Sequence, residues 1–133
     1  MKTFFAGGFL YNPKTQEVLL HKRDDKTDIN PNKWAFFGGL SEGDETPVQT
    51  FIREMYEELS IKFSKNEVIH LCDYENMERN THRYSFYAVS DKKKEEMELG
   101  EGADFAWIPL DNVFKLDATQ KTLDDLNIFI KKL

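Results

Sequence analysis

The segment from Pro47 to Leu59, PVQTFIREMYEEL, constrains the fold more than any other part of the sequence. Its apolar side chains recur at the spacing of one face of an α-helix. Pro47 suits the first turn of such a helix, because proline lacks the backbone N–H that would be unpaired there. The pattern predicts a helix over residues 47–59 that packs its apolar face on another layer of structure. Its apolar positions are Val48, Phe51, Ile52, Met55 and Leu59.

Short apolar runs bounded by turn-forming residues lie on both sides of this helix and are typical of β-strands. A polar turn at residues 11–16 separates the first two runs, as in an antiparallel hairpin, and the polar segment 24–33 is predicted to be a loop. The predicted strands cover residues 4–10, 17–23, 34–40, 67–76, 81–90 and 105–110.

A second amphipathic helix is expected at the end of the sequence. Asp117 and Gln120 have the spacing of a helix-capping pair. The apolar stripe that follows consists of Leu123, Leu126, Ile130 and Leu133. Strands mixed with two helices predict an α/β or α+β sandwich.

The composition bounds the class of protein. A chain of 133 residues with 40% hydrophobic and 14% aromatic residues is expected to form one domain over residues 1–133 and not a disordered chain. Its net charge of −6 disfavours DNA or RNA as a partner. The single cysteine, Cys72, cannot form a disulfide within the chain and indicates a reducing, cytoplasmic location. The apolar runs are shorter than the ~18 residues that a membrane helix needs, so no membrane partner is expected.

Three glutamates share one face of the predicted helix. Glu54, Glu57 and Glu58 stand at positions i, i+3 and i+4. Like charges repel, so three carboxylates on one face favour a bound cation, and hard oxygen ligands select Mg²⁺, Mn²⁺ or Ca²⁺. The alternative for the Glu-Glu pair taken alone is an ordinary solvated face, because glutamate-rich helices are common on protein surfaces.

The residues around this face form a longer pattern. It runs Gly, five residues, Glu, seven residues, Arg-Glu, an apolar residue, any residue, Glu-Glu, and its fixed positions here are Gly39, Glu45, Arg53, Glu54, Glu57 and Glu58. Six fixed positions recur by chance on the order of once in 10⁵ chains of this size. The pattern resembles the box of the Nudix hydrolases, and the likeness extends to VLLHKR and WAFFGG upstream and to EGADFAW downstream.

This resemblance implies a Nudix-type α/β/α sandwich with a mixed β-sheet. It also implies metal-dependent hydrolysis of a diphosphate linked to a nucleoside, with Mg²⁺ or Mn²⁺ as the cofactor. Glu54, Glu57 and Glu58 would be the catalytic carboxylates, with Glu54 either a ligand or the general base. The implied metal ligands are the carbonyl of Gly38 and the carboxylates of Glu54, Glu57, Glu58 and Glu101.

The resemblance also suggests roles for residues outside the acidic face. Glu45 and Arg53 would form a structural ion pair. Arg23 would contact a phosphate, although a surface charge is an equal alternative. Phe37 stands where proline often precedes the glycine pair and would shape the substrate cleft. Tyr84 would stack on a nucleobase, the alternative being an ordinary core ring.

The sequence favours some classes of substrate over others. A nucleoside triphosphate is favoured among small-molecule nucleotides, with a nucleotide sugar or an ADP-ribose-type compound as alternatives. A rival from another class is a Nudix-fold nucleotide sensor without catalysis, and the complete glutamate set argues against it. A calcium-binding EF-hand is disfavoured, because its ligand run is missing. A monomer or a homodimer is expected. Ser60 stands where the box has glycine at a left-handed helix end.

Overall fold

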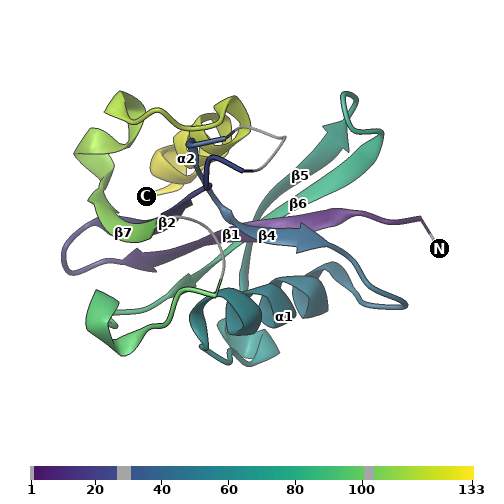
Figure 1. Cartoon of the computed structure of the whole chain (residues 1–133), viewed down its shortest axis with the longest axis horizontal. Helices are drawn as coiled ribbons and strands as arrows, with labels where there is room; N and C mark the ends of the chain where they lie inside the picture. Colours follow the sequence, from purple (N-terminus) through teal and green to yellow (C-terminus); the bar gives the residue numbers. More distant parts are fainter. Residues whose placement is uncertain (1, 27–30, 101–103) are drawn as a thin grey trace.

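A mixed β-sheet with a helix on each face forms the molecule (Figure 1). The computed structural model describes residues 2–26, 31–100 and 104–133. Within these residues the sheet has seven strands in the order β3-β2-β1-β6-β5, while β4 pairs with β1 and β7 pairs with β2. The strands are β1 (Phe5–Asn12), β2 (Glu17–Lys22), β3 (Trp34–Ala35), β4 (Phe37–Leu40), β5 (Ile69–Asn76), β6 (Thr81–Val89) and β7 (Asp104–Pro109).

Strand β1 is the centre of the sheet. It runs parallel to β6 over residues 5–11, and antiparallel to β4 over residues 5–8 and to β2 over residues 10–12. Gly8 permits this crowding, because a Cβ there would collide with the carbonyl oxygen of Phe86 on β6. The combination of parallel and antiparallel pairs confirms the predicted mixed sheet.

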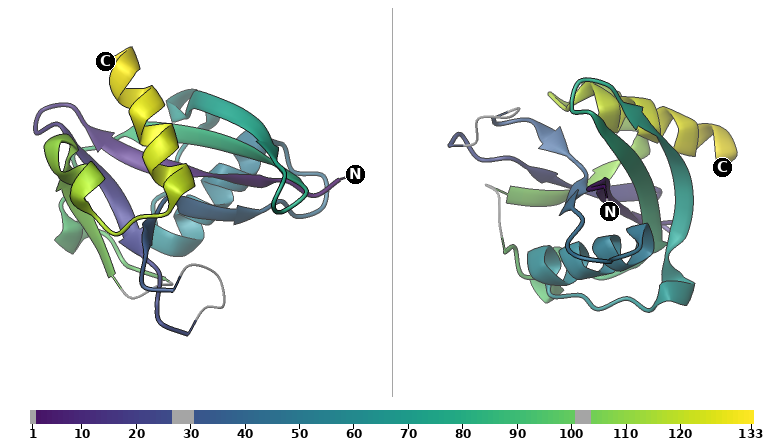
Figure 2. Two further views of the ribbon diagram at one scale, coloured as in Figure 1. Left: turned by 90° about the horizontal axis from the view of Figure 1, so that it is seen from above. Right: turned by 90° about the vertical axis from the view of Figure 1, so that its right-hand side faces the viewer.

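The two helices cover opposite faces of the sheet, as the views in Figures 1 and 2 show. Helix α1 (Pro47–Leu59) has the predicted bounds, and Thr46 with Gln49 forms the capping box at its start. Helix α2 (Gln120–Lys132) lies on the other face. Short 3₁₀ turns cover residues 65–67, 94–96 and 110–115.

Alternation along the strands divides the apolar residues into two cores. Phe37, Phe51, Met55, Leu59 and Phe86 belong to the core between the sheet and α1. A second core lies between the sheet and α2, and it contains Phe9, Phe36, Leu71, Leu126 and Phe129. The sheet is therefore buried on both faces, which confirms the predicted sandwich.

The start of α2 differs from its predicted form. The N-cap is Thr119, whose hydroxyl accepts the N–H of Thr122, and Asp117 lies outside the helix. Thr119, two residues after Asp117, takes the capping position, because its short side chain can reach the unpaired N–H groups of the first helical turn. The buried positions are Thr122, Asp125, Leu126 and Phe129, while Leu133 of the predicted stripe is exposed.

The predicted strand over residues 34–40 is interrupted at Phe36, which separates β3 from β4. The strand breaks because β3 pairs with β2, whereas β4 pairs with β1. None of the helices in the described part of the chain is both long enough and apolar enough to span a membrane.

Candidate active site

The acidic face is positioned by α1. Phe51, Met55 and Leu59 hold the helix on the sheet, because all three are fully buried. The carboxylates beside this stripe differ in exposure. The side chain of Glu54 is 14% exposed and that of Glu57 is 53% exposed, while Glu58 as a residue is buried. The face therefore extends from the protein interior to solvent along one side of α1.

The glycine pair in the middle of β4 brings backbone against this face. Gly38 has a φ of 149°, a region that L side chains rarely adopt, and its N–H donates to Glu58 Oε2 at 3.1 Å. A Cβ at Gly39 would collide with the carboxylate of Glu54. Gly39 thus leaves the space in which the Glu54 carboxylate lies, and the Gly38 N–H binds that of Glu58.

Arg53 binds the carboxylates that surround it. Its Nε lies 2.7 Å from Glu45 Oε2 and its Nη2 lies 3.1 Å from Glu45 Oε1, a bidentate pair. Its Nη1 lies 3.1 Å from Glu54 Oε1 and 3.3 Å from Glu57 Oε2, and its Nη2 also donates to the carbonyl of Leu40 at 3.0 Å. Arg53 therefore ties the loop before α1 to the acidic face.

The Glu45–Arg53 pair changes the titration of both groups. The hydrogen bond from Arg53 lowers the pKa of the Glu45 carboxyl to about 2 and raises the pKa of the guanidinium. Thr50 Oγ1 and the N–H of Glu42 also donate to Glu45 Oε1, each at 2.9 Å. Glu45 is therefore a charged acceptor for side chains and backbone at neutral pH.

The donor chemistry of the acidic face fits a hard divalent cation. Carboxylate oxygens and the backbone beside Gly38 are ligands that Mg²⁺ and Mn²⁺ accept. In the described residues, no three Asp, Glu, His or Cys side chains already form a metal-ligand group. Arg53 is the cation that contacts Glu54 and Glu57 in this arrangement.

Glu101, the fourth predicted carboxylate ligand, lies outside the described residues. The residue before it is positioned by the end of α1. The N–H of Gly100 donates to the carbonyl of Glu58 at 2.8 Å, and a Cβ at Gly100 would collide with the carbonyl of Glu57. The chain that leads to Glu101 is thus held against the turn of α1 that carries two of the glutamates.

The remaining predicted site residues lie in different surroundings. Arg23 follows β2, and its backbone N–H donates to the carbonyl of Lys33. Burial lowers the pKa of His21 to about 4, and the positive charge of Arg23 adds to this effect. Tyr84 is half-buried on the α1 side of β6, with its ring 5.3 Å from Phe4. The structure brings Glu45, Arg53, Glu54 and Glu57 together around one guanidinium, whereas Tyr84 packs beside Phe4 at the edge of the α1 core.

Phe37 requires a correction. Its ring has no exposed surface and stacks on His21, with the centroids 4.8 Å apart. Because residues alternate along β4, Phe37 points into the core beneath α1. It cannot line a substrate cleft, and the expectation that it does so is wrong.

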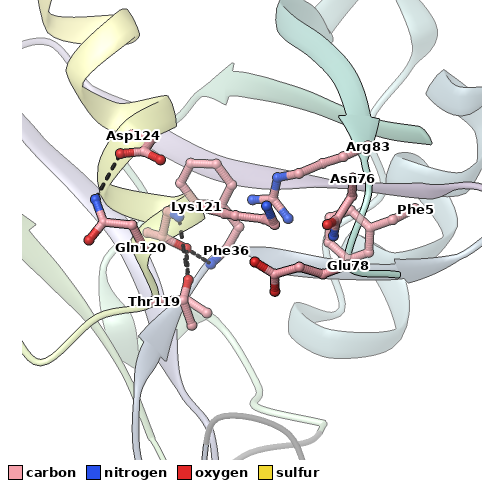
Figure 3. A pocket seen from close by; sticks show the side chains of 11 residues that line it. Phe5, Phe36, Asn76, Glu78, Arg83, Thr119, Gln120, Lys121 and Asp124 are labelled. Carbon is pink, nitrogen blue, oxygen red and sulfur yellow. Dashed lines mark hydrogen bonds between the residues drawn. The ribbon is translucent and has the colours of Figure 1, made fainter. Parts of the chain in front are cut away.

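A cavity of about 420 Å³ lies on the α2 side of the sheet (Figure 3). Ligand sites commonly have volumes of about 300–1,000 Å³. Side chains from β1, β5, β6, the turn between β5 and β6, and the start of α2 surround the cavity. They include Phe5, Phe36, Asn76, Glu78, Arg83 and Lys121.

Sequence reasoning missed this cavity because its walls come from distant segments. A signal was present in the helix pattern: Thr122 and Asp125 occupy the same buried phase as Leu126 and Phe129. On β6, the buried residues Arg83 and Ser85 likewise share a face of the strand with the half-buried Tyr87, and this face is turned toward the α2 core. Polar residues on the buried face of a helix or strand need hydrogen-bond partners, and they therefore indicate a buried polar site.

Comparisons with known proteins agree with this geometry. Residues 1–127 match the NUDIX domain family. A dihydroneopterin triphosphate diphosphatase from Haemophilus influenzae is 25% identical, over an alignment that covers 93% of this chain and 85% of that protein.

Two solved structures show the same fold. One is a MutT described in a study of Aliivibrio salmonicida and Vibrio cholerae, with a TM-score of 0.82, 18% identity and full coverage of both chains. The other is a bifunctional NMN adenylyltransferase/ADP ribose pyrophosphatase from Francisella tularensis, complexed with AMP and a manganese ion, with a TM-score of 0.77 and 20% identity. That match covers 99% of this chain but 42% of the bifunctional protein, so this chain spans less than half of its length. The chain belongs to the NUDIX domain family and is a hydrolase that acts on pyrophosphate bonds.

Proposed function

We propose that this chain is a Mg²⁺- or Mn²⁺-dependent hydrolase of small nucleotides, with a nucleoside triphosphate favoured as the substrate. The observation that carries this proposal is the acidic face of α1, in which Glu54 and Glu58 pack against the glycine pair of β4. Three carboxylates placed together cost electrostatic energy, which a bound divalent cation offsets. The manganese ion named with the Francisella tularensis structure supports the same class of cofactor.

In this proposal Glu57, Glu58, Glu101 and the Gly38 carbonyl hold the cation, and Glu54 is a further ligand or the general base. When bound, the cation offsets the charge of the diphosphate and makes an attacking water more acidic. The general base takes the proton of that water at a carboxylate oxygen. The water oxygen forms a bond to phosphorus, the bridging P–O bond breaks, and the leaving phosphate keeps its electron pair.

Two further expectations belong to the same proposal. We place the enzyme in the cytoplasm, which the single cysteine supports. The partner is a small nucleotide and not a nucleic acid polymer, in keeping with the net charge of −6. The alternatives for the substrate are an ADP-ribose-type compound, as the name of the Francisella tularensis protein suggests, and a pterin triphosphate, as the Haemophilus influenzae relative suggests.

A substrate panel tests the proposal. The purified chain is incubated with Mg²⁺ or Mn²⁺ and each nucleoside triphosphate, ADP-ribose, a nucleotide sugar or dihydroneopterin triphosphate. Phosphate is measured before and after inorganic pyrophosphatase is added, which separates release of pyrophosphate from release of phosphate. We expect turnover that EDTA abolishes and that is highest with a nucleoside triphosphate.

Glu57→Gln is the sharpest variant for this test, because the Glu57 side chain is 53% exposed and its change should leave the fold intact. We expect turnover to fall about 100-fold or more, while the circular dichroism spectrum stays unchanged. Glu95→Gln removes an exposed glutamate that is none of the proposed ligands and should keep full turnover. Near wild-type turnover of Glu57→Gln at saturating Mg²⁺ would contradict the proposed role.

A further inference from the structure

Residues 97–100 follow the 3₁₀ turn at 94–96 and lie against the C-terminal end of α1. In Figure 1 this segment is green and runs from that turn to the end of the helix. Met97 is 6% exposed and belongs to the core beneath α1, and Leu99 packs against the same core. We call residues 97–100 the strap. Its two apolar side chains make it part of the packed molecule.

The chain that leads into the strap is fixed on β7. Trp107 Nε1 donates to the carbonyl of Lys92 at 2.9 Å. Lys94 Nζ donates to Asp104 Oδ1, also at 2.9 Å. The strap therefore reaches α1 from a segment that the sheet holds in place.

The strap supplies hydrogen-bond partners for the end of α1. The last carbonyls of a helix have no partner within the helix itself. The N–H of Gly100 donates to the carbonyl of Glu58 at 2.8 Å, and the N–H of Glu98 donates to the carbonyl of Leu59 at 3.4 Å. Two neighbouring carbonyls of the last turn are thus bound by the strap.

Gly100 makes the closest contact of the strap with α1. A Cβ at Gly100 would collide with the carbonyl oxygen of Glu57. The described glycines with a positive φ are Gly38 and Gly43, so the conformation of Gly100 is one that other residues adopt. The close approach to the helix is therefore the feature that requires glycine at position 100.

The turn that the strap contacts carries two of the proposed ligands. Glu58 is held twice, because its carbonyl accepts from Gly100 and its carboxylate accepts from the N–H of Gly38 at 3.1 Å. The carbonyl of Glu57 faces Gly100, and its carboxylate lies 3.3 Å from Arg53 Nη1. The strap thus holds the main chain of both glutamates, while other elements hold their side chains.

We propose that Gly100 is a positioning residue, which lets the strap close on the last turn of α1 and so places the carboxylates of Glu57 and Glu58 for a divalent cation. A side chain at position 100 would push the strap and this turn apart, because the atoms that it meets belong to the backbone. Ligand side chains have to be held within about 0.5 Å of the geometry that binds the metal. This inference rests on the proposed function, because it assumes that the acidic face binds the cation.

The same contacts couple cation binding to the strap. If the docked strap raises the affinity of the acidic face for a cation, the bound cation stabilises the docked strap by the same factor, because such coupling is reciprocal. The hydrogen bonds from Gly100 and Glu98 to α1 should therefore open less often when the cation is bound.

Mn²⁺ binding without any nucleotide tests the role of Gly100 separately from turnover. Electron paramagnetic resonance measures the free Mn²⁺ and gives its dissociation constant. We expect Gly100→Ala to weaken Mn²⁺ binding about tenfold, a typical cost of changes behind metal ligands. Equal affinity of the wild-type protein and Gly100→Ala would overturn the inference alone. A wild-type protein that binds no Mn²⁺ would overturn the proposed function and the inference with it.

Val113→Ala is the control for a general loss of stability. Val113 is fully buried in the core beneath α2, on the face of the sheet opposite to the strap. This variant should lower the urea midpoint but keep the Mn²⁺ affinity of the wild-type protein. A loss of affinity in Val113→Ala as large as that in Gly100→Ala would make the effect one of stability and would overturn the positioning role.

Hydrogen exchange in the unaltered protein provides a second test that needs no variant. NMR follows the amides of Gly100 and Glu98 with and without saturating Mg²⁺. We expect Mg²⁺ to slow their exchange at least fivefold. The amide of Leu110, which donates to the carbonyl of Gln16 at 3.0 Å, should keep its rate. Exchange at Gly100 that Mg²⁺ does not change would overturn the inference.

Discussion

Ser60 ends α1 in the left-handed conformation, with φ 59° and ψ 29°, and its N–H donates to the carbonyl of Tyr56 at 2.9 Å. A Cβ in this conformation is crowded by the following carbonyl. Ser60 is exposed, so its side chain adds little packing. Ser60→Gly should therefore raise the free energy of unfolding by about 1 kcal/mol.

Urea unfolding with equal m-values measures this change. Ser60→Ala is the matched control, because it removes the hydroxyl but keeps the Cβ and should bring no gain. A lower midpoint for Ser60→Gly would mean that the flexibility of glycine in the unfolded chain outweighs the relief of strain.

Arg53 is the residue whose loss should affect stability and activity together. Arg53→Ala leaves Glu45, Glu54 and Glu57 without their shared cation and frees the loop that Arg53 ties to α1. We expect the free energy of unfolding to fall by about 2 kcal/mol, with a loss of turnover. Arg79→Ala, which removes an exposed arginine of the β5–β6 turn, should change neither.

The pH dependence of this loss separates a structural role from phosphate binding. The pKa of Glu45 is lowered from 4.5 to about 2 in the folded protein, so its stabilising effect is complete above pH 4.5 and is lost as the pH falls toward 2. In Arg53→Ala, the free energy of unfolding should therefore fall less between pH 4.5 and pH 2 than it does in the wild-type protein. An unchanged urea midpoint with only a raised KM would instead make Arg53 a phosphate ligand.

Strands β5 and β6 carry a second charged group on their α1 side. His82 Nδ1 lies 2.7 Å from Glu75 Oε1, and His82 Nε2 lies 2.7 Å from Asp73 Oδ1. Both ring nitrogens face carboxylates, so the protonated form is favoured and the pKa of His82 is raised. This stabilisation is present below the unfolded pKa of about 6.5 and is lost as the pH rises through the higher folded value.

We therefore expect the urea midpoint to fall between pH 6 and pH 9, and His82→Gln to reduce that fall. His21 does not account for such a fall. Burial lowers the pKa of His21 to about 4, so its contribution changes between pH 4 and pH 6.5 and is constant above that range. NMR titration of the His82 ring gives its pKa directly. A pKa below 6.5, or an equal fall in the variant, would contradict the effect.

The sequence predicted the mixed sheet with two helices, because the patterns that define each helix and strand lie within short segments. The bounds of α1 follow from its apolar spacing, the following Ser60 and the leading Pro47, all of which lie within one short segment. The roles of Glu54, Glu57 and Glu58 stay predictions, although the geometry at Gly38 and Gly39 supports them.

Features that depend on distant partners could not be predicted in this way. The expectation for Phe37 rests on its place before the glycine pair, which does not state which face of the strand the core takes. Helix α1 covers the face to which Phe37 points. The cavity joins residues as distant as Phe5 and Asp124. Such contacts arise only from the topology of the sheet, and no local window of sequence contains them.

The parallel pairing of β1 with β6 also determines the order in which the molecule assembles. Phe5 pairs with Arg83 and Tyr11 with Val89, so the first strand has no parallel neighbour until most of the chain has left the ribosome. Closing so long a loop is slow, and the apolar β1 segment is meanwhile exposed to aggregation and to chaperones. Arg83 gains Asp125 later still, when α2 docks. The cavity on the α2 side of the sheet is therefore among the last regions of the molecule to form.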